Sequence, residues 1–292
     1  MSTPIPNLLG IAGTDPTGGA GIQADLKTFG ALGTYGMAVV TAVVAQNTQA
    51  VQAVSPVSPA LVAAQLEAVF SDVAVAAVKI GMVANAEIAA TIGEALARYQ
   101  PAFVVFDPVM AASTKGALMD ERQLVRIREV LLPQVSLITP NLREAGRLLD
   151  CAPPTDEAGM HACLPGLHGL GVPNVLLKGG HLAGEAVDLL STPAGVVRLT
   201  APRVQTRHGH GTGCTLSSAI AARWALREGV AGAEAGSATA TPAPPPPATL
   251  HTDAMHLEMA VRQAKAYVHG ALAHADELRV GHGSGPLHHF WA

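Results

Sequence analysis

The stretch AVAAVKIGMVANAEIAATIGEALARYQPAFVVF, residues 74–106, contains the unit from which the fold can be predicted. Its two ends, residues 74–80 and 103–106, are short and, apart from Lys79, apolar, as buried strands are. Between them, residues 86–98 carry apolar side chains at helical spacing. A strand, a helix and a second strand in this order predict two parallel strands joined by a crossover helix.

The same alternation continues in both directions along the chain. Further strands are expected at residues 8–12, 37–45, 135–138 and 175–177. Further helices are expected at residues 21–32, 61–70, 121–131, 142–149 and 157–170, followed by a hairpin (188–191 with 195–200) and helices at 215–227 and 253–277. Apolar strands alternating with helices predict an α/β fold, with a mostly parallel sheet covered by helices on both faces.

One stretch breaks this pattern. Residues 231–250, AGAEAGSATATPAPPPPATL, include four consecutive prolines and predict a flexible surface insertion. The residues that follow it are too few to form a core of their own. We therefore expect a single domain over residues 1–292, and we expect deletion of the insertion to leave the chemistry intact.

The composition excludes several classes of protein. Hydrophobic residues make up 49% and charged residues 14% of the chain, which excludes a disordered protein. A net charge of −4 argues against a nucleic-acid or anionic-membrane surface. The most extended uncharged stretch contains glutamines and prolines that a membrane span would not carry. The three cysteines form no C-x-x-C pair, so we expect a cytoplasmic protein without disulfides.

The motif with the clearest chemistry is HGTGCT, residues 210–215, directly before an Ala-rich helix. Glycines at the start of a helix expose backbone N–H groups, and these groups form an anion site together with the helix dipole. Cys214 lies in the first turn, where the pKa of a thiol tends to fall. The thiol could act as a base towards a substrate hydroxyl or only orient it. A glycine-rich helix start around a small buried cysteine would give the same pattern.

A second glycine-rich motif, GTDPTGGAG at residues 13–21, joins the first strand to the first helix. It fits neither the dinucleotide-binding fingerprint nor the P-loop pattern. Its glycines permit close approach of the backbone to a ligand at the carboxyl end of a strand, where open α/β sheets bind. Asp25 in the first helix and Gln46 after an apolar strand are at the same sheet edge, and could pair with a heterocycle. Each is also explained as an ordinary helix-start acid or loop amide.

Two acidic residues and a lysine suit a site for phosphate and a divalent cation. Asp107 follows the strand at 103–106, and Glu144 lies in NLRE, residues 141–144. Mg²⁺ takes one or two carboxylates together with phosphate oxygens and water. Lys178 directly follows the apolar run at 175–177, at the end of that strand, and can reach a phosphate. Ordinary turn, helix-start and loop positions would explain the same three residues.

Eight colinear blocks of the sequence resemble one family. They are GTDPTGGAGIQADLKTF, VVTAVVAQNT, KIGM, FDPVM, LITPNLREA, LLKGGH, HGHGTGCTLSSA and GHGSGPLHHF. Together they resemble the bacterial hydroxymethylpyrimidine/phosphomethylpyrimidine kinases of thiamine biosynthesis, which belong to the ribokinase-like superfamily. The resemblance runs from about residue 8 to residue 290, except in the insertion. It implies a ribokinase-like three-layer fold, a homodimer, and the use of ATP and Mg²⁺ to phosphorylate a hydroxymethylpyrimidine and then its monophosphate.

The resemblance also assigns roles to residues of this chain. Gln46 matches the glutamine that recognises the pyrimidine. The same pocket would be lined by Gly13, Asp25, Met82 and the backbone of Val44. Cys214 matches the position where sugar kinases of the superfamily carry an aspartate base. The remaining matches concern phosphate and metal: Gly211, Thr212 and Gly213 as the anion hole, Lys178 beside the phosphates, and Asn141 and Glu144 as the motif that organises Mg²⁺.

Three other functions fit parts of the sequence. A pyridoxal kinase of the same superfamily, or a kinase with both activities, would phosphorylate a similar hydroxymethyl group. A pyrimidine-sensing module without activity has no need of Lys178, Glu144 or the anion hole. A hydrolase with a cysteine nucleophile would need a histidine and an orienting acid beside Cys214. His210 is near in sequence, but no third partner is evident.

Overall fold

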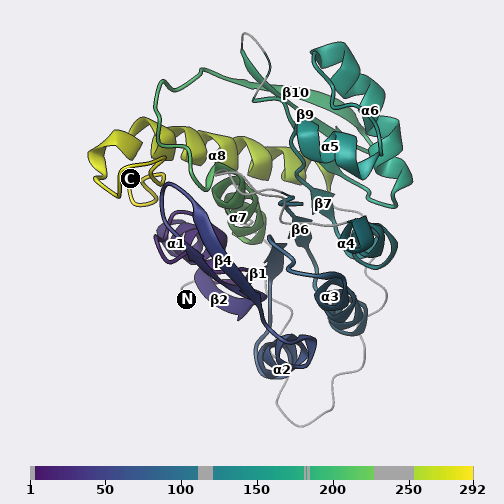
Figure 1. Ribbon diagram of the computed structural model, residues 1–292. Coiled ribbons are helices and arrows are strands. Elements are labelled where there is room, and N and C mark those ends of the chain that lie inside the picture. The colour runs from purple at the N-terminus through teal and green to yellow at the C-terminus, as the bar shows by residue number, and fades with distance from the viewer. Residues whose placement is uncertain (1–3, 111–120, 181, 183–184, 227–252, 292) are drawn as a thin grey trace.

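The central feature of the computed structural model is an eight-stranded sheet (Figure 1). The structure describes residues 4–110, 121–180, 182, 185–226 and 253–291. In spatial order the sheet contains β10 (Gly195–Ala201), β9 (Ala186–Thr192), β8 (Val175–Lys178), β7 (Leu137–Ile138), β6 (Val104–Phe106), β5 (Ala77–Ile80), β1 (Asn7–Ala12) and β2 (Tyr35–Val40). From β8 to β2 all neighbours are parallel, and β9 pairs antiparallel with both β8 and β10.

Helices cover both faces of this sheet (Figure 1). One face packs against α2 (Pro59–Phe70), α3 (Ala86–Tyr99), α4 (Glu121–Arg126), α5 (Leu142–Leu148) and α6 (Glu157–Gly169). The other packs against α1 (Gly21–Ala31), α7 (Thr212–Ala225) and α8 (Ala254–Ala273). The buried strands are almost entirely aliphatic, as a sheet covered on both faces requires. The predicted three-layer α/β architecture is therefore confirmed.

The predicted strand at 37–45 is wrong in one respect. The chain forms two strands there, β2 and β3 (Ala42–Gln46), and they belong to different sheets. β3 pairs antiparallel with β4 (Val51–Pro56), a strand that was not predicted, and the two form a separate two-stranded hairpin. The alternation of buried and exposed residues in β3 shows that it is covered on one face only. Gln46 therefore lies on this hairpin and not at the end of a sheet strand.

The other expected elements differ from the observed ones mainly at their ends. The helix expected at 121–131 changes from α4 into a π-helical turn, Ile127–Leu131, and a 3-10 turn, Leu132–Gln134. The helix expected at 215–227 begins earlier, at Thr212, so that the HGTGCT motif enters the helix itself. The insertion at 231–250, and with it the single-domain prediction for that part, lies outside the described residues.

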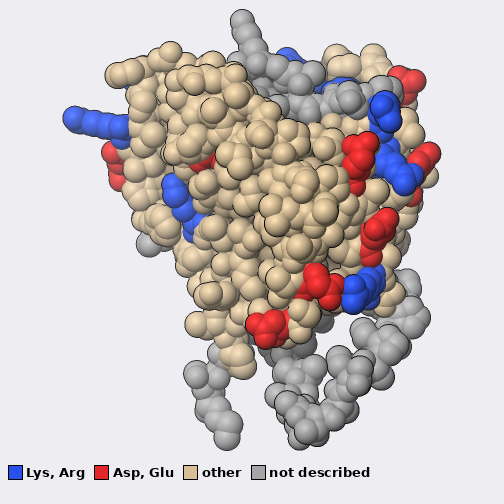
Figure 2. All heavy atoms as spheres, turned by 60° about the horizontal axis from the view of Figure 1, so that its bottom comes forward, with Lys and Arg blue, Asp and Glu red and all other residues tan. Residues whose placement is uncertain are grey.

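The surface carries few charges on the face shown in Figure 2. Acidic and basic groups lie beside one another towards its margin, and uncharged residues occupy its centre. On this face the drawn residues form no continuous basic surface of the kind that binds nucleic acid. In the part of the chain that the structure describes, no helix combines the length and apolarity needed to cross a bilayer.

Candidate active site

The candidate site lies where the parallel strands end at their carboxyl edge. The loop of residues 13–20 follows β1, Gly81 and Met82 follow β5, and Asp107 follows β6. Residues 139–141 follow β7, and Lys178 is the last residue of β8. Open α/β sheets bind ligands at this edge, because the loops from neighbouring strands converge there. The order of the strands along the chain reverses between β1 and β5, which places the crevice beside β1.

The amino end of α7 forms a second wall of the site. Gly211 precedes the helix with a φ of 88°, and the helix has no side-chain cap. A Cβ at this position would overlap the carbonyl oxygen of Gly19, so only glycine allows the two loops to touch. A Cβ at Gly213 would lie 3.0 Å from Asp107 Oδ2 and 3.4 Å from Lys178 Nζ. The exposed first-turn amides therefore adjoin a lysine, an arrangement suited to an anion.

Lys178 is held by a buried carboxylate. Its Nζ lies 2.8 Å from Asp107 Oδ1, which also accepts a hydrogen bond from Thr139 Oγ at 3.0 Å. Burial lowers the pKa of Lys178, but the carboxylates of Asp107 and Glu144 more than offset this and raise it above its usual value. The ammonium therefore stays charged at the edge of the site.

Glu144 is fixed by hydrogen bonds at the start of α5, and burial alters its pKa. Its Oε2 accepts the Asn141 N–H at 2.7 Å while the Asn141 side chain accepts the N–H of Glu144, which forms a capping box at the start of α5. Burial raises the pKa of Glu144 to about 7, with Lys178 lowering it and Asp107 raising it. The group therefore titrates near neutral pH.

These carboxylates fit a divalent cation. Asp107 and Glu144 are close enough for the charge of one to raise the pKa of the other, and an added cation would relieve that repulsion. The capping box uses one Glu144 oxygen, which leaves the second for a metal-bound water or the metal itself. A Cβ at Gly213 would crowd Asp107 and Lys178, so glycine keeps the first turn of α7 close to both side chains. The predicted metal and phosphate residues are thus brought together.

Cys214 is partly exposed in the first turn of α7. The prediction of a lowered thiol pKa is wrong. Burial and the carboxylates of Asp25 and Asp107 raise the pKa of the thiol to about 11, although Lys79 and the Gly21 N–H oppose this. The thiol is therefore neutral at pH 7, so a base role would require proton loss from an unusually weak acid.

The acceptor side of the site is built around Gly13. A Cβ there would lie 3.1 Å from Met82 Sδ, so these two predicted pocket residues are neighbours. Thr14 donates its N–H to Ala42 O at 3.0 Å and accepts the Val44 N–H at Oγ, at 2.9 Å. The predicted backbone contribution of Val44 therefore cannot come from its N–H, which is already bonded.

Gln46 and Asp25 occupy different surroundings. Gln46 is half-buried at the end of β3, and among the described residues its side chain makes no hydrogen bond. Asp25 is completely buried: its Oδ1 lies 2.6 Å from Lys79 Nζ and accepts from Ser218 Oγ at 2.7 Å. Asp25 thus lies beneath the surface of the site, while Gln46 is at its edge. Lys79 was missed because nothing in KIGM distinguishes a buried lysine from an exposed one.

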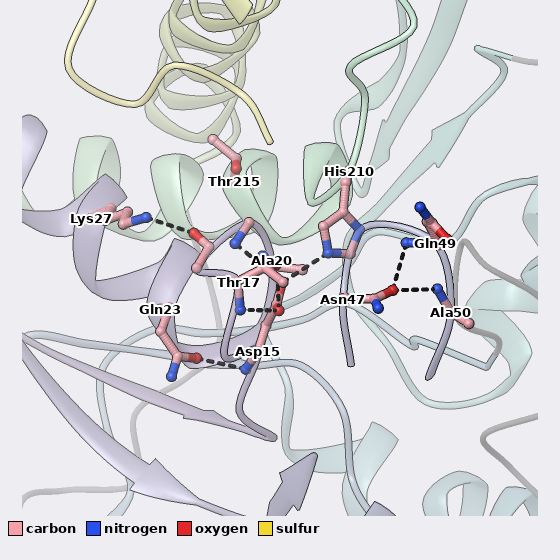
Figure 3. A network of polar contacts seen from close by, with 12 residues as sticks. Asp15, Thr17, Ala20, Gln23, Lys27, Asn47, Gln49, Ala50, His210 and Thr215 are labelled. Carbon is pink, nitrogen blue, oxygen red and sulfur yellow. Dashed lines mark hydrogen bonds and ion pairs between the residues drawn. The ribbon is translucent and has the colours of Figure 1, made fainter. Parts of the chain in front are cut away.

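Asp15, for which the sequence predicted no role, organises the glycine-rich loop (Figure 3). Its Oδ1 accepts the N–H and the hydroxyl of Thr17, and its Oδ2 accepts the N–H groups of Gly19 and Ala20. His210 Nε2 lies 2.8 Å from Oδ2. Burial raises the pKa of Asp15, but the hydrogen bonds from His210 and Thr17 outweigh burial and hold that pKa well below its usual range. One carboxylate thus ties the loop after β1 to the loop before α7.

Comparison with known proteins gives a consistent result. The profile of the family described as phosphomethylpyrimidine kinase matches residues 15–239. A hydroxymethylpyrimidine/phosphomethylpyrimidine kinase of Escherichia coli (strain K12) is 49% identical over 287 residues, covering 98% of this chain and 98% of its own length. The Rhizobium meliloti (strain 1021) protein of the same name is 47% identical and covers 97% and 96%.

Solved structures agree with the sequences. The phosphomethylpyrimidine kinase of Clostridium difficile 630 superposes with a TM-score of 0.73 at 37% identity, covering 91% of this chain and 99% of that one. The pyridoxal kinase of Staphylococcus aureus, in complex with AMP-PCP and pyridoxal, superposes with a TM-score of 0.81 at 29% identity, covering 99% and 94%. The expected ribokinase-like architecture is shared by these neighbours.

Proposed function

Because the chain belongs to the phosphomethylpyrimidine kinase family and is therefore a phosphotransferase, we infer which phosphoryl transfer it catalyses. It phosphorylates 4-amino-5-hydroxymethyl-2-methylpyrimidine with ATP, and then phosphorylates the monophosphate to the diphosphate, in thiamine biosynthesis. One observation supports this best. Gly213 at the amino end of α7 adjoins the Lys178–Asp107 pair, and both charged groups shift the pKa of Glu144. Gly13 and Met82 are neighbours and form the acceptor wall.

We propose that the acceptor oxygen attacks the γ-phosphorus in line between these two walls. The first-turn amides of α7, at Gly211, Thr212 and Gly213, bind the oxygens of the transferring group, and Lys178 neutralises their charge. Asp107 and Thr139 hold the lysine in place. In this chemistry the protein contributes positioning and electrostatic stabilisation more than covalent catalysis.

Cys214 orients the acceptor in this proposal. A thiol with a pKa of about 11 remains protonated at neutral pH, and can hydrogen-bond to the acceptor oxygen. A loose transition state needs little deprotonation of the nucleophile before transfer, so a strong base is not required. The alternative is that Cys214 acts as a base and its thiolate accepts the proton of the acceptor hydroxyl. In that case turnover should rise as the pH approaches the thiol pKa of about 11.

Glu144, Asn141 and Asp107 are the residues that we assign to Mg²⁺ and its waters. When bound, Mg²⁺ supplies charge neutralisation and alignment of the phosphates. The Asn141 capping box fixes the Glu144 side chain, so the carboxylate keeps its direction without the metal. Gln46 is assigned to the pyrimidine ring and amino group, and Asp25 acts from beneath the pocket.

A homodimer and a cytoplasmic location complete the proposal. The β3–β4 hairpin exposes 58% of Val43 and 37% of Val54, and the neighbouring edge strand β2 exposes 62% of Tyr35. A second copy that covered this apolar surface would remove it from water. Sedimentation equilibrium of wild type and Val43→Glu tests the dimer, and a monomeric wild type contradicts it.

The cytoplasmic location rests on the cysteines. All three are free thiols, which suits a reducing compartment.

Mass spectrometry of the reaction products tests the activity. The protein is incubated with Mg·ATP and, in separate reactions, with hydroxymethylpyrimidine, its monophosphate and pyridoxal. We expect the monophosphate from the first reaction and the diphosphate from the second. The second candidate function is that of a pyridoxal kinase, which the similarity to a pyridoxal kinase in complex with pyridoxal supports. Pyridoxal phosphate as the sole product would favour it. No product from any reaction would contradict both.

A further inference from the structure

The C-terminal block GHGSGPLHH, residues 281–289, has no role in the proposed mechanism. It follows α8 and the 3-10 turn Ala275–Glu277, and returns towards the amino end of α7 (Figure 1). Leu287 is completely buried in the core formed with α7 and α8. Tyr267 of α8 donates its hydroxyl to the His289 carbonyl oxygen at 2.6 Å. The segment is therefore anchored at its end and presents its glycine-rich part to the site.

One contact of this segment is with the hairpin that carries Gln46. The Gly283 N–H donates to Thr48 Oγ at 3.0 Å, across 235 positions of the chain. The Thr48 side chain is well buried, with 5% of the residue exposed. A Cβ at Gly283 would overlap the Thr48 carbonyl oxygen, so the two backbones touch. Figure 1 shows the hairpin and the C-terminal coil converging on the same side of the molecule.

The next residues of the same segment hold the loop before α7. Gly285 donates its N–H to His208 Nδ1 at 2.9 Å and accepts the His210 N–H at 3.1 Å. Pro286 packs against Gly19, where a Cβ would lie 3.1 Å from the Pro286 Cβ. Figure 3 shows His210 between the Asp15 loop and the turn at Asn47. Contacts of Gly283, Gly285 and Pro286 thus connect the hairpin that carries Gln46, the loop before α7 and the glycine-rich loop after β1.

The hairpin needs such a support. A two-stranded hairpin is marginally stable alone in water, and β3–β4 does not join the central sheet. Its base is fixed by the bonds from Val44 to Thr14 and from Thr41 Oγ to Met82 O. Its turn is closed internally by Asn47, whose side-chain oxygen accepts the backbone N–H groups of Gln49 and Ala50. The bond from Gly283 to Thr48 fixes this turn to the rest of the molecule.

We propose that Thr48 is a positioning residue for the pyrimidine, and that residues 281–289 are the brace through which it acts. By holding the turn two residues beyond Gln46, the brace sets the distance between the recognition amide and the anion hole of α7. This inference rests on the proposed role of Gln46. It predicts an effect on the acceptor substrate that ATP binding does not share, because the bond from Gly283 fixes the turn of the hairpin and involves neither Lys178 nor the first turn of α7.

The test compares Thr48→Val, which removes the hydroxyl at equal size, with Thr48→Ser, which keeps it. The KM for hydroxymethylpyrimidine should rise about two- to tenfold in Thr48→Val, as the net value of one hydrogen bond implies, and the KM for ATP should not change. Thr48→Ser should restore the wild-type value. Gly283→Ala should resemble Thr48→Val, whereas Gly30→Ala, which has open space at its Cβ, should resemble wild type.

Hydrogen–deuterium exchange of the amides of residues 47–50 gives a second measurement that does not require turnover. Faster exchange in Thr48→Val, but not in Thr48→Ser, supports the brace. This result does not depend on activity: if wild type fails to phosphorylate the pyrimidine, only the proposed function has failed. Unchanged exchange in Thr48→Val, or equal changes in both KM values, overturns the inference. If Thr48→Val does not fold, Thr48→Ala replaces it with the same expected results.

Discussion

Replacement of Lys79 by methionine should strongly destabilise this protein, because Lys79 is completely buried and neutralises the equally buried Asp25. Lys79 lies on β5 and Asp25 on α1, and both side chains are completely buried. Their charged atoms are 2.6 Å apart, and Ser218 of α7 donates to the same carboxylate oxygen. The pair thus joins the central sheet to the two helices that carry the acceptor loop and the anion hole.

The size of the effect follows from what remains after the substitution. Asp25 would keep one donor, Ser218, for Oδ1, while Oδ2 already has no hydrogen-bond partner among the described residues. An uncompensated buried charge of this kind costs about 3–5 kcal/mol. A domain of ordinary stability has about 5–15 kcal/mol in total, so Lys79→Met should lose a large fraction of it.

The loss should depend on pH in a defined direction. Burial raises the pKa of Asp25 even in the presence of Lys79, and removal of the ammonium raises that pKa further. A group whose pKa is higher in the folded state stabilises the protein at low pH, and this contribution is lost as the pH rises through the folded pKa. Lys79→Met should therefore be closer to wild type at pH 5 than at pH 8.

Urea denaturation followed by circular dichroism at both pH values measures the free energy of unfolding. The matched control is the double variant Lys79→Met/Asp25→Asn, which removes both charges and keeps an acceptor for Ser218. It should recover most of the stability, since neutral residues often replace a buried ion pair at little cost. The reasoning is refuted if Lys79→Met unfolds within about 1 kcal/mol of wild type, or if the double variant is as unstable as the single one.

Three further predictions concern the site itself. Cys214→Ala should lose most turnover with KM values near those of wild type, and the rate of Cys214 alkylation should rise with pH towards its pKa of about 11; unchanged turnover would remove Cys214 from the mechanism. At subsaturating Mg²⁺, wild-type turnover should rise with pH through about 7 as Glu144 ionises. In Glu144→Gln, turnover should be low at every pH and should not show that rise. A wild-type pH dependence of turnover in the variant would contradict the metal assignment. Asp15→Asn should lower the free energy of unfolding by about 2–3 kcal/mol at pH 7, because the amide replaces a charged acceptor of several hydrogen bonds. Since the folded pKa of Asp15 is depressed, the difference should shrink as the pH falls below about 4, and a constant difference would refute it.

The sequence predicted the central sheet well because its strands are buried on both faces. Runs such as those at β1 and β8 are continuously apolar, and that signal survives without knowledge of the neighbours. The signal failed between residues 37 and 45, where two short apolar strands follow one another with a single residue between them. Apolarity reported burial correctly there, but it carried no information on which sheet each strand joins.

The site divides in the same way. Gly211 before a helix and Glu144 near a helix start are visible in the local sequence, but spacing left an ordinary helix start as an alternative for both, and their roles came from the family resemblance. The raised pKa of the Cys214 thiol was not predictable, because it depends on burial of the thiol and on Asp25 and Asp107, which lie on other elements of the fold.

The residues that the sequence concealed share one property: each acts through a partner that is distant in the chain. Asp15 meets His210 across 195 positions, and Thr48 meets Gly283 across 235. A single sequence contains each half of such a pair but not the pairing, which only the topology creates. Each contact joins two different loops around the site, so we expect such contacts to set the separation of the acceptor and phosphate groups. The chemistry is therefore local in sequence, whereas the geometry that makes it productive is not.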